Sequence, residues 1–267
     1  MDYPNRKQKT AYLTIDDSPS ASFSQKMNYL YEKNIPAIFF CIGQLLEQYP
    51  EPIIEAIQKG FPIANHSFTH PHFSNIGIEQ AEEEIRKTDE IIDDLYQKSG
   101  VKRSQKWFRF PYGDKGDKQY GRVLEQPFSI KNLWQKRDTK RRRAIQNILK
   151  KYGYTQPSFE SISYPYMRKA GLFKETDWHW TFDIMEWATF EQKPTLGIDD
   201  FSKIVARLHS ENPPDCRGKI GTEKRWLASD VPEIILLHDH LKTDGIFNGI
   251  IDELGKLPLH FEDFDEL

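Results

Sequence analysis

The chain of 267 residues carries 37 Lys and Arg against 40 Asp and Glu, and 38% of its residues are hydrophobic. This is enough for one large α/β domain or two small ones, while a net charge of −3 is too small to indicate nucleic acid or a membrane surface as a partner. No apolar run approaches the roughly 20 residues of a membrane-spanning helix, and two cysteines give neither a disulfide framework nor a Cys-based zinc site.

Strand-like apolar runs alternate with helix-like patterns along the chain. The runs predict strands at residues 11–15, 36–42, 61–64, 106–110, 178–182 and 233–237. Apolar residues at steps of three and four predict one helix through Phe23, Met27, Leu30 and Tyr31, and others at 44–58, 79–98, 138–151, 160–170, 199–210 and 246–256. Such alternation implies parallel strands with right-handed crossovers. We therefore expect a (β/α) barrel that need not be regular.

Two segments interrupt this alternation. Residues 114–160 form a predicted insertion, and its basic run KRDTKRRR at 136–143 is interpreted as a solvated helix face rather than a patch that binds a polyanionic polymer. Residues 211–232 are predicted as a second long loop. We otherwise expect residues 1–267 to form a single domain.

Polar side chains gather where the predicted strands end. They are Asp16 and Asp17, His66 and His70, the run Arg109 to Gly113, Asp183 with Glu186, and His238. In a parallel barrel the carboxyl ends of the strands share one face, and that face holds the active site. We therefore expect these clusters to meet in space.

The expected cluster has the composition of a catalytic metal site. His66 and His70 are four residues apart, which predicts one face of a helical turn, and one carboxylate of Asp16 or Asp17 completes three ligands for Zn²⁺ or a similar ion. Three protein ligands leave a position for a water of lowered pKa, whose proton the other aspartate can accept. Each motif alone is unspecific, since an H-x₃-H pair is often a helix surface feature and an Asp pair is often a helix cap.

Five motifs in order resemble those of the polysaccharide deacetylases with a NodB homology domain, carbohydrate esterase family 4. The family patterns T-F-D-D-G-P, H-[ST]-x-x-H, R-x-P-[YF]-G, W-x-V-D-x-x-D-W and L-x-H-D are matched by TIDDSP at 14–19, HSFTH at 66–70, RFPYG at 109–113, WTFDIMEW at 180–187 and LLHD at 236–239. The resemblance spans residues 12–240, and it implies a distorted (β/α) barrel and metal-dependent hydrolysis of acetyl groups on sugars.

The resemblance also implies roles for single residues. Asp16 corresponds to the general base, and His238 corresponds to the general acid. The implied metal ligands are Asp17, His66 and His70. Arg109 is implied to pair with Asp16, Asp183 to tune the charge of His238, and the backbone N–H of Tyr112 to bind the oxyanion. The implied substrate contacts are Trp187, Leu236, Pro111 and Glu186.

The chain departs from the family pattern at several positions. Ser18 replaces the usual Gly after the two aspartates, which costs stability if that residue needs a positive φ. Glu186 replaces Asp in the fourth motif and reaches farther. The insertion at 114–160 follows the third motif directly, so it bears on the substrate more than on the chemistry.

The sequence leaves several alternatives open. An N-deacetylase acting on peptidoglycan, chitin-type oligomers or poly-N-acetylglucosamine is favoured over an O-acetyl esterase using the same site, and over an inactive carbohydrate-binding relative. The implied cofactor is one divalent metal ion, Zn²⁺ before Co²⁺ or Ni²⁺. The expected partner is an acetylated glycan, with no nucleic acid.

The residues MDYPNRKQK lack the apolar segment of a signal peptide, whereas the resemblance favours a secreted or cell-envelope protein. The oligomeric state is open.

Overall fold

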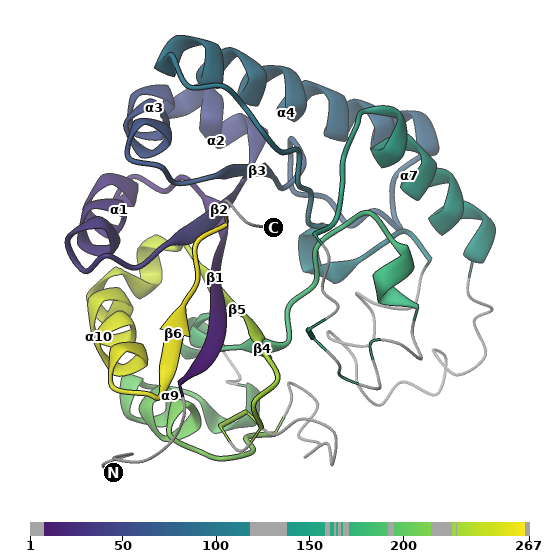
Figure 1. Cartoon of the computed structure of the whole chain (residues 1–267). Coiled ribbons are helices and arrows are strands. Elements are labelled where there is room, and N and C mark those ends of the chain that lie inside the picture. Colours follow the sequence, from purple (N-terminus) through teal and green to yellow (C-terminus); the bar gives the residue numbers. More distant parts are fainter. Residues whose placement is uncertain are drawn as a thin grey trace. The chain divides into compact units, whose positions relative to one another are not determined.

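A computed structural model describes residues 8–117, 138–157, 161–162, 164, 167, 171–191, 195–214, 226–227 and 229–264 (Figure 1). The chain divides into two compact units, each described here by itself. Unit 1 comprises residues 1–39, 158–173 and 180–267, and unit 2 comprises residues 40–157 and 174–179.

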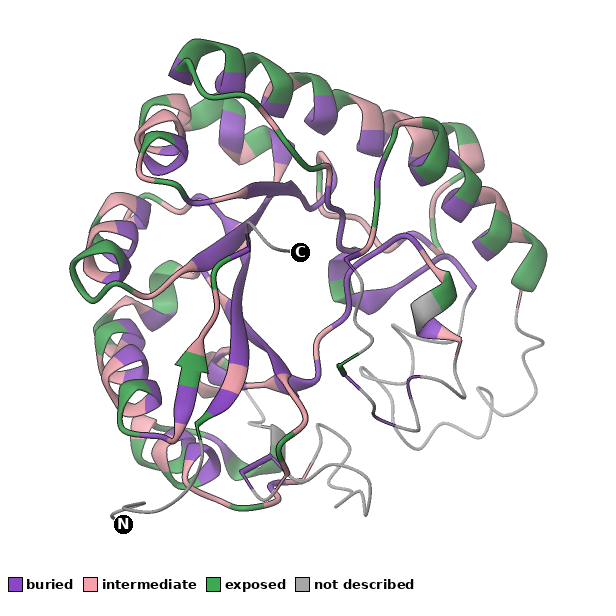
Figure 2. Cartoon of the chain, in the orientation of Figure 1, coloured by how far each residue is buried: buried purple, intermediate pink, exposed green. Residues whose placement is uncertain are grey.

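Four parallel strands form the sheet of unit 1. β1 (Lys9–Ser18) pairs with β5 (Glu233–His238) on one side and with β6 (Leu259–Phe261) on the other, and β4 (Phe182–Asp183) pairs with β5. The register sets Asp16 opposite His238. β1 and β5 are buried along most of their length, as Figure 2 shows, which fits near-continuous apolar runs such as EIILL.

Three helices of unit 1 follow the predicted patterns. They are α1 (Phe23–Glu32), α9 (Phe201–Leu208) and α10 (Asp244–Gly255), and α10 contacts the other two. Phe23, Met27 and Leu30 are buried on α1 as predicted, but Tyr31 is 51% exposed, so its inclusion in the apolar face was wrong. Asp200 caps α9 by accepting a hydrogen bond from the Lys203 N–H.

Unit 2 is built mainly from helices around the short strand β3 (Ile63–Asn65). They are α2 (Gly43–Gln48), α3 (Pro50–Gln58), α4 (Ile78–Ser99) and α7 (Thr139–Lys151). The single helix predicted at 44–58 is two helices, because Pro50 cannot continue α2 and instead begins α3. The predicted stop of α4 is confirmed, since Gly100 caps it with a φ of 75°.

Strand β2 (Ala37–Cys41) leads the chain from unit 1 into unit 2. The hydrogen-bonded order of the sheet is β3-β2-β1-β5-β4, with β6 beside β1. The strands alternate with helices along the chain, so the predicted α/β class is confirmed. Among the described strands, β3 and β4 are the two ends of this order, so the strands do not close into a ring.

Two predicted strands are shorter than expected. In the run 106–110 only Phe108 forms a bridge, with Asn65, and in the run 178–182 only Phe182 lies in a strand. Both runs are rich in aromatic residues, and one from each packs together: Trp178 lies 5.1 Å from Trp107 between ring centroids, and 5.9 Å from Phe40 of β2. Side-chain packing therefore replaces ladder hydrogen bonds there.

The remaining described elements are single turns of 3₁₀ helix: η1 (Pro111–Gly113), η2 (Leu172–Lys174), η3 (Glu186–Phe190), η4 (Thr195–Gly197) and η5 (Leu241–Thr243). Most of the loop predicted at 211–232, most of the helix predicted at 160–170, and residues 118–137 of the predicted insertion lie outside the described residues. The single domain with an insertion at 114–160 stays a prediction.

The basic run lies partly in α7, and its predicted solvated face is wrong at one position. Arg142 is buried, and it forms ion pairs with Asp117 at 2.7 Å and with Glu175. Thr139, Lys140 and Arg143 are exposed as predicted, while Lys136 and Arg137 lie outside the described residues. The run therefore serves partly as an internal ion-pair surface.

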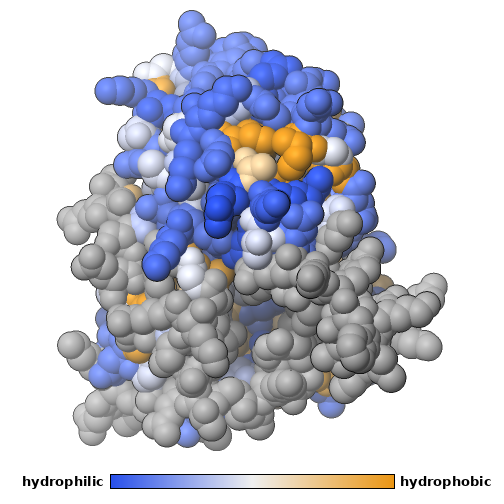
Figure 3. Space-filling view, turned by 90° about the vertical axis from the view of Figure 1, so that its right-hand side faces the viewer, coloured by the Kyte–Doolittle hydropathy of each residue, from blue (hydrophilic) through white to orange (hydrophobic). Residues whose placement is uncertain are grey.

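The described surface agrees with a charged chain. Figure 3 shows one face on which the coloured residues are mostly hydrophilic and surround a compact hydrophobic area. Among the described helices, none is both long and apolar enough to cross a membrane.

Candidate active site

Asp16 and Asp17 lie within the last residues of β1, which runs on to Ser18 instead of ending at Ile15 as predicted. Asp16 is buried, with 3% of its surface exposed. Asp17 has a φ of 63°, and its Oδ2 lies 3.1 Å from Nε2 of His240. The left-handed backbone at Asp17 turns the chain at the strand end, so the adjacent carboxylates have different surroundings.

His238, at the end of β5, is half-buried and forms an ion pair with the buried Glu186. Nδ1 of His238 lies 2.7 Å from Oε1 of Glu186, and the His238 N–H donates to the same oxygen at 2.8 Å. Burial alone would lower the pKa of His238, but the charge and hydrogen bond of Glu186, together with Asp17 and Asp16, raise it to about 10. The imidazolium form is therefore strongly favoured at neutral pH.

Asp183 has other partners in the described part of unit 1. Its Oδ1 accepts hydrogen bonds from the Met185 N–H at 2.8 Å and from Nε1 of Trp187 at 3.2 Å. Burial raises the pKa of Asp183, and the positive charge of His238 opposes this shift. The direct contact with His238 thus belongs to Glu186, while the tuning role implied for Asp183 stays a prediction. Asp183 also orients Trp187, one of the implied substrate contacts.

Asp239 fixes the chain around the first and fifth motifs. Its carboxylate accepts hydrogen bonds from the Ser20 N–H at 2.7 Å, from Ser20 Oγ at 2.6 Å and from Nζ of Lys26 at 2.6 Å. The implied substrate contact Leu236 lies in β5 and is buried, with 2% of its surface exposed. The L-x-H-D pattern includes Asp239, but the sequence does not reveal that Ser20 and Lys26 bind its carboxylate.

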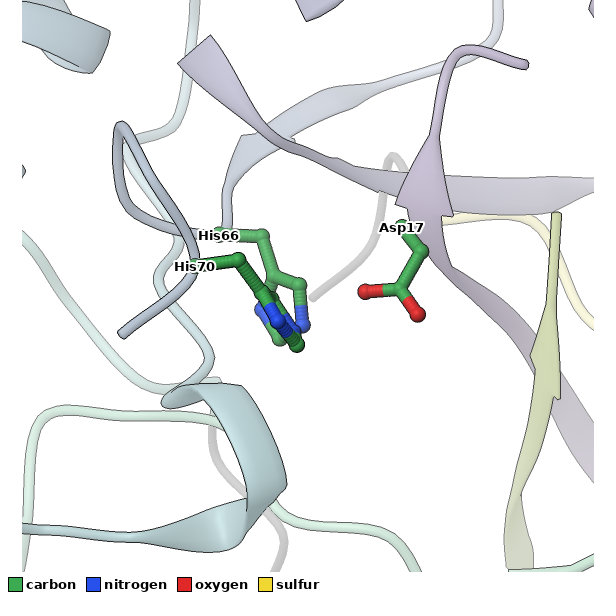
Figure 4. Close-up of side chains that lie close together, drawn as sticks. All are labelled: Asp17, His66 and His70. Carbon is green, nitrogen blue, oxygen red and sulfur yellow. The ribbon is translucent and has the colours of Figure 1, made fainter. Parts of the chain in front are cut away.

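His66 and His70, in unit 2, lie on an irregular bend and not on the predicted helical turn. Ser67 and His70 have φ values of 69° and 57°, which an α-helix cannot contain. The two rings still lie near each other, with centroids 4.9 Å apart. Figure 4 shows these rings together with the third predicted ligand, Asp17, which comes from the end of β1.

The donor chemistry of His66 fits a metal ligand. Its Nδ1 lies 2.8 Å from the carbonyl oxygen of Arg109, so this nitrogen carries the proton in the neutral ring. In this tautomer Nε2 is the ligand atom, which is the usual arrangement of a metal-binding histidine. The residues of unit 2 therefore suit a divalent ion such as Zn²⁺.

Two buried side chains that the sequence did not single out shape this bend. Asn65 accepts from the Ser67 N–H at 2.8 Å and donates to the Ile85 carbonyl at 2.9 Å. Glu84 accepts from the N–H groups of Phe68 and Thr69 at 2.9 and 2.7 Å. Backbone groups within H-[ST]-x-x-H need such acceptors because they form no helix, and the position of Glu84 on the inner face of α4 was the available signal.

Arg109, Pro111 and Tyr112 belong to the third-motif loop, residues Arg109–Gly113. Arg109 is fully buried, lies 4.2 Å from the Phe40 ring centroid and donates from Nη2 to the His179 carbonyl at 3.3 Å. Tyr112 has a φ of 56° and is 44% exposed, with its ring stacked on His72 at 3.9 Å. The loop thus joins a buried cation to an exposed aromatic ring.

Backbone strain is concentrated in the motifs. Apart from Asn34 and Leu196, every non-glycine residue of the described ranges with a positive φ lies in one of the first four motifs; these are Asp17, Ser67, His70, Tyr112 and Met185. Such conformations cost about 1–3 kcal/mol each and cluster at functional sites. Their placement is evidence for function that is independent of the sequence pattern.

Comparison with known proteins agrees with the motifs. Residues 3–126 match the model of the polysaccharide deacetylase family. The resemblance to the polysaccharide deacetylases is thereby confirmed. A peptidoglycan-N-acetylglucosamine deacetylase of Bacillus cereus is 32% identical over 128 residues, which are 48% of this chain and 44% of that protein. The match thus spans less than half the length of this relative.

Solved structures match over nearly the whole chain. A family 4 carbohydrate esterase from Streptomyces lividans, in complex with acetate, has a TM-score of 0.56 at 21% identity and covers 96% of this chain and 93% of its own. A pseudoenzyme of the same esterase family from Bacillus anthracis has a TM-score of 0.57 at 15% identity and covers 97% and 65%. At these identities the likeness establishes the fold, which both an enzyme and a pseudoenzyme adopt.

Proposed function

We propose that the protein is a metal-dependent deacetylase that hydrolyses N-acetyl groups of an amino-sugar glycan. The observation that carries the proposal is the partly buried His238–Glu186 pair, at 2.7 Å, on the strand whose register sets His238 opposite Asp16. A protonated imidazole and a carboxylate at neighbouring strand ends are the acid and the base that amide hydrolysis needs. The intact motifs and the strained backbone within them favour this function over an inactive relative.

Asp17, His66 and His70 are the proposed metal ligands, with carboxylate and imidazole donors suited to Zn²⁺ before Co²⁺ or Ni²⁺. When bound, the ion supplies Lewis-acid activation of water and of the acetyl carbonyl. Asp16 accepts the proton of the attacking water. Arg109 is the proposed charge partner of Asp16.

The leaving group defines the role of His238. An amine leaves as a neutral molecule only if its nitrogen is protonated, so His238 donates the proton that Glu186 helps it to retain. The Tyr112 N–H binds the oxyanion. Trp187, Leu236 and Pro111 form the proposed contacts to the acetyl group and the sugar. Glu186, expected as a substrate contact, is instead proposed as the partner of His238.

The proposed substrates share N-acetylglucosamine. The Bacillus cereus relative is named for this sugar in peptidoglycan, and chitin-type oligomers and poly-N-acetylglucosamine contain the same acetamide. These three glycans are therefore the candidates. We further propose that the insertion at 114–160, which follows the third-motif loop, selects among them.

Acetate release from these glycans and from acetylated xylan, with and without chelator, tests the proposal. We expect wild-type release from at least one N-acetylated glycan, abolished by chelator and restored by Zn²⁺. Asp16→Asn should lose at least about 10³-fold in kcat while it keeps its metal, because it removes only the base. Asp17→Ala should lose both activity and metal.

Two outcomes would change the proposal. Release from acetylated xylan alone would identify an O-acetyl esterase. No release from any substrate by the metal-loaded wild type would reject the enzyme. Equal metal loss in Asp16→Asn and Asp17→Ala, measured by elemental analysis, would show that the roles of the two aspartates are misassigned.

A further inference from the structure

A buried lysine follows the third-motif loop directly. Lys115 is 1% exposed, and its Nζ lies 2.7 Å from Oδ2 of Asp177 and 2.5 Å from Oε2 of Glu175. The same ammonium donates to Nε2 of His179. We call these four residues the Lys115 cluster; all of them belong to unit 2.

The Lys115 cluster resembles a metal site that the chain fills with its own cation. Glu175, Asp177 and His179 each offer a ligand atom, and these atoms lie within 4.8 Å of one another. Because the Lys115 ammonium contacts all three, it takes the place of an ion. Burial and the charge of Lys115 lower the pKa of His179, so its ring is neutral and accepts the hydrogen bond.

The segment Lys174–His179 contacts both ends of the third-motif loop. Before the loop, the Trp178 N–H donates to the Phe108 carbonyl at 2.8 Å. At its first residue, Nη2 of Arg109 donates to the His179 carbonyl at 3.3 Å. After the loop, Lys115 binds Asp177 and Glu175. The segment therefore spans the loop, and its position sets the direction of the buried Arg109 guanidinium.

Helix α7 fixes the same segment from another side. Nε2 of Gln146 donates to Asp177 at 2.6 Å, while Oε1 of Gln146 accepts from the Thr176 N–H at 2.8 Å. Arg142 pairs with Glu175. These contacts join the segment to α7, whereas Lys115 joins both of its carboxylates to the end of the third-motif loop.

We propose that Lys115 is a positioning residue for Arg109. The proposal rests on the proposed function, in which Arg109 pairs with Asp16. Without the ammonium, the buried carboxylates of Glu175 and Asp177 lose a cation that they share, and like charges in a low dielectric repel. The segment then moves, and the His179 carbonyl no longer holds Arg109. Misplacement of a charged group by about 1 Å costs roughly 100-fold in rate.

The first test compares Lys115→Met with Lys9→Met. Lys9 is another buried lysine, in unit 1, that pairs with Glu233 at 2.7 Å, so it controls for the loss of a buried ion pair. We expect Lys115→Met to lower kcat by about 10- to 100-fold with KM unchanged, and Lys9→Met to leave both unchanged in the folded protein. Lys115→Arg, which keeps the charge, should recover part of kcat.

A double variant separates positioning from general damage. If Lys115 acts through Arg109, Lys115→Met in an Arg109→Met background should lower kcat by less than twofold. If the two substitutions instead lower kcat independently, so that their fold losses multiply in the double variant, the proposal is overturned.

Hydrogen exchange by mass spectrometry gives a readout that needs no activity. Peptides covering residues 107–113 and 174–179 should exchange at least about 10-fold faster in Lys115→Met than in wild type, and should be unaffected in Lys9→Met. Wild-type exchange in Lys115→Met would reject the positioning role. If the wild type releases no acetate, the proposed function fails, and the exchange data alone decide whether Lys115 holds the segment.

Discussion

The two halves of the proposed site are held in different ways. In unit 1, Asp16 and His238 lie opposite each other on paired parallel strands, so the backbone ladder sets their spacing. In unit 2, His66, His70 and Arg109 lie on irregular backbone near a single bridge, and buried side chains such as Asn65 and Glu84 hold them. Ladders tolerate the loss of one side chain, whereas a loop held by side chains does not.

The largest expected effect concerns the ion pair of Glu186 with His238 in the strand-held half. In Glu186→Gln the amide oxygen can still accept from Nδ1 of His238, but the negative charge is gone. Burial then lowers the pKa of His238 unopposed by Glu186. Only protonated His238 can donate, so its raised pKa keeps the wild type active into the alkaline range. As the pH rises, the variant should lose activity earlier than the wild type.

We expect the alkaline limb of kcat/KM to move down by about two pH units, so that kcat/KM falls about 10-fold at pH 9 and about 50-fold at pH 10. Asp183→Asn is the matched control, since Asp183 is the other carboxylate of the fourth motif, and its limb should move less. An unmoved limb in Glu186→Gln together with a moved one in Asp183→Asn would return the tuning role to Asp183.

Much of unit 1 was predictable from the sequence because its site residues lie at the ends of regular, apolar strands. Period and apolar content locate β1 and β5, and parallel pairing then brings their ends together. The Glu186–His238 contact was not predictable, because a chain that leaves β4 through the left-handed Met185 sends Glu186, not Asp183, toward His238.

The loops of unit 2 were predictable in composition but not in conformation. The spacing of His66 and His70 is compatible with a helical turn, and only the contacts of Asn65 and Glu84 make the bend more favourable. The Lys115 cluster was missed because its acidic members lie 60 or more residues further along the chain. Contacts of that range leave no periodic signal in one sequence.

An intermediate effect is expected where a side chain holds a loop. Asn65→Ala removes the hydrogen bonds to Ser67, Ile85 and Tyr154 and leaves buried groups unpaired, so the free energy of unfolding should fall by about 3 kcal/mol. The metal affinity should fall about 10-fold, since His66 follows directly.

Thr14→Val is the control from unit 1. It removes one buried hydrogen bond, from Oγ1 to the Ile235 carbonyl at 2.7 Å, within the β1–β5 ladder. We expect a loss of about 1 kcal/mol, measured by denaturant unfolding, and an unchanged metal affinity. Equal losses in the two variants would contradict the contrast between the units.

The smallest expected effect lies at Ser18, which stands in place of the Gly in the pattern T-F-D-D-G-P. Asp17, and not Ser18, has the positive φ, so the position does not need glycine. Ser18 is fully buried, and its Oγ has no hydrogen-bond partner among the described residues. Ser18→Ala should therefore leave the free energy of unfolding unchanged or raise it by up to about 1 kcal/mol.

Ser18→Gly should lower the free energy of unfolding by about 0.5–1 kcal/mol, because glycine gains more freedom in the unfolded chain. A stabilising Ser18→Gly would mean that the ladder at the end of β1 carries strain. The strand-held half of the site would then extend only as far as Asp17.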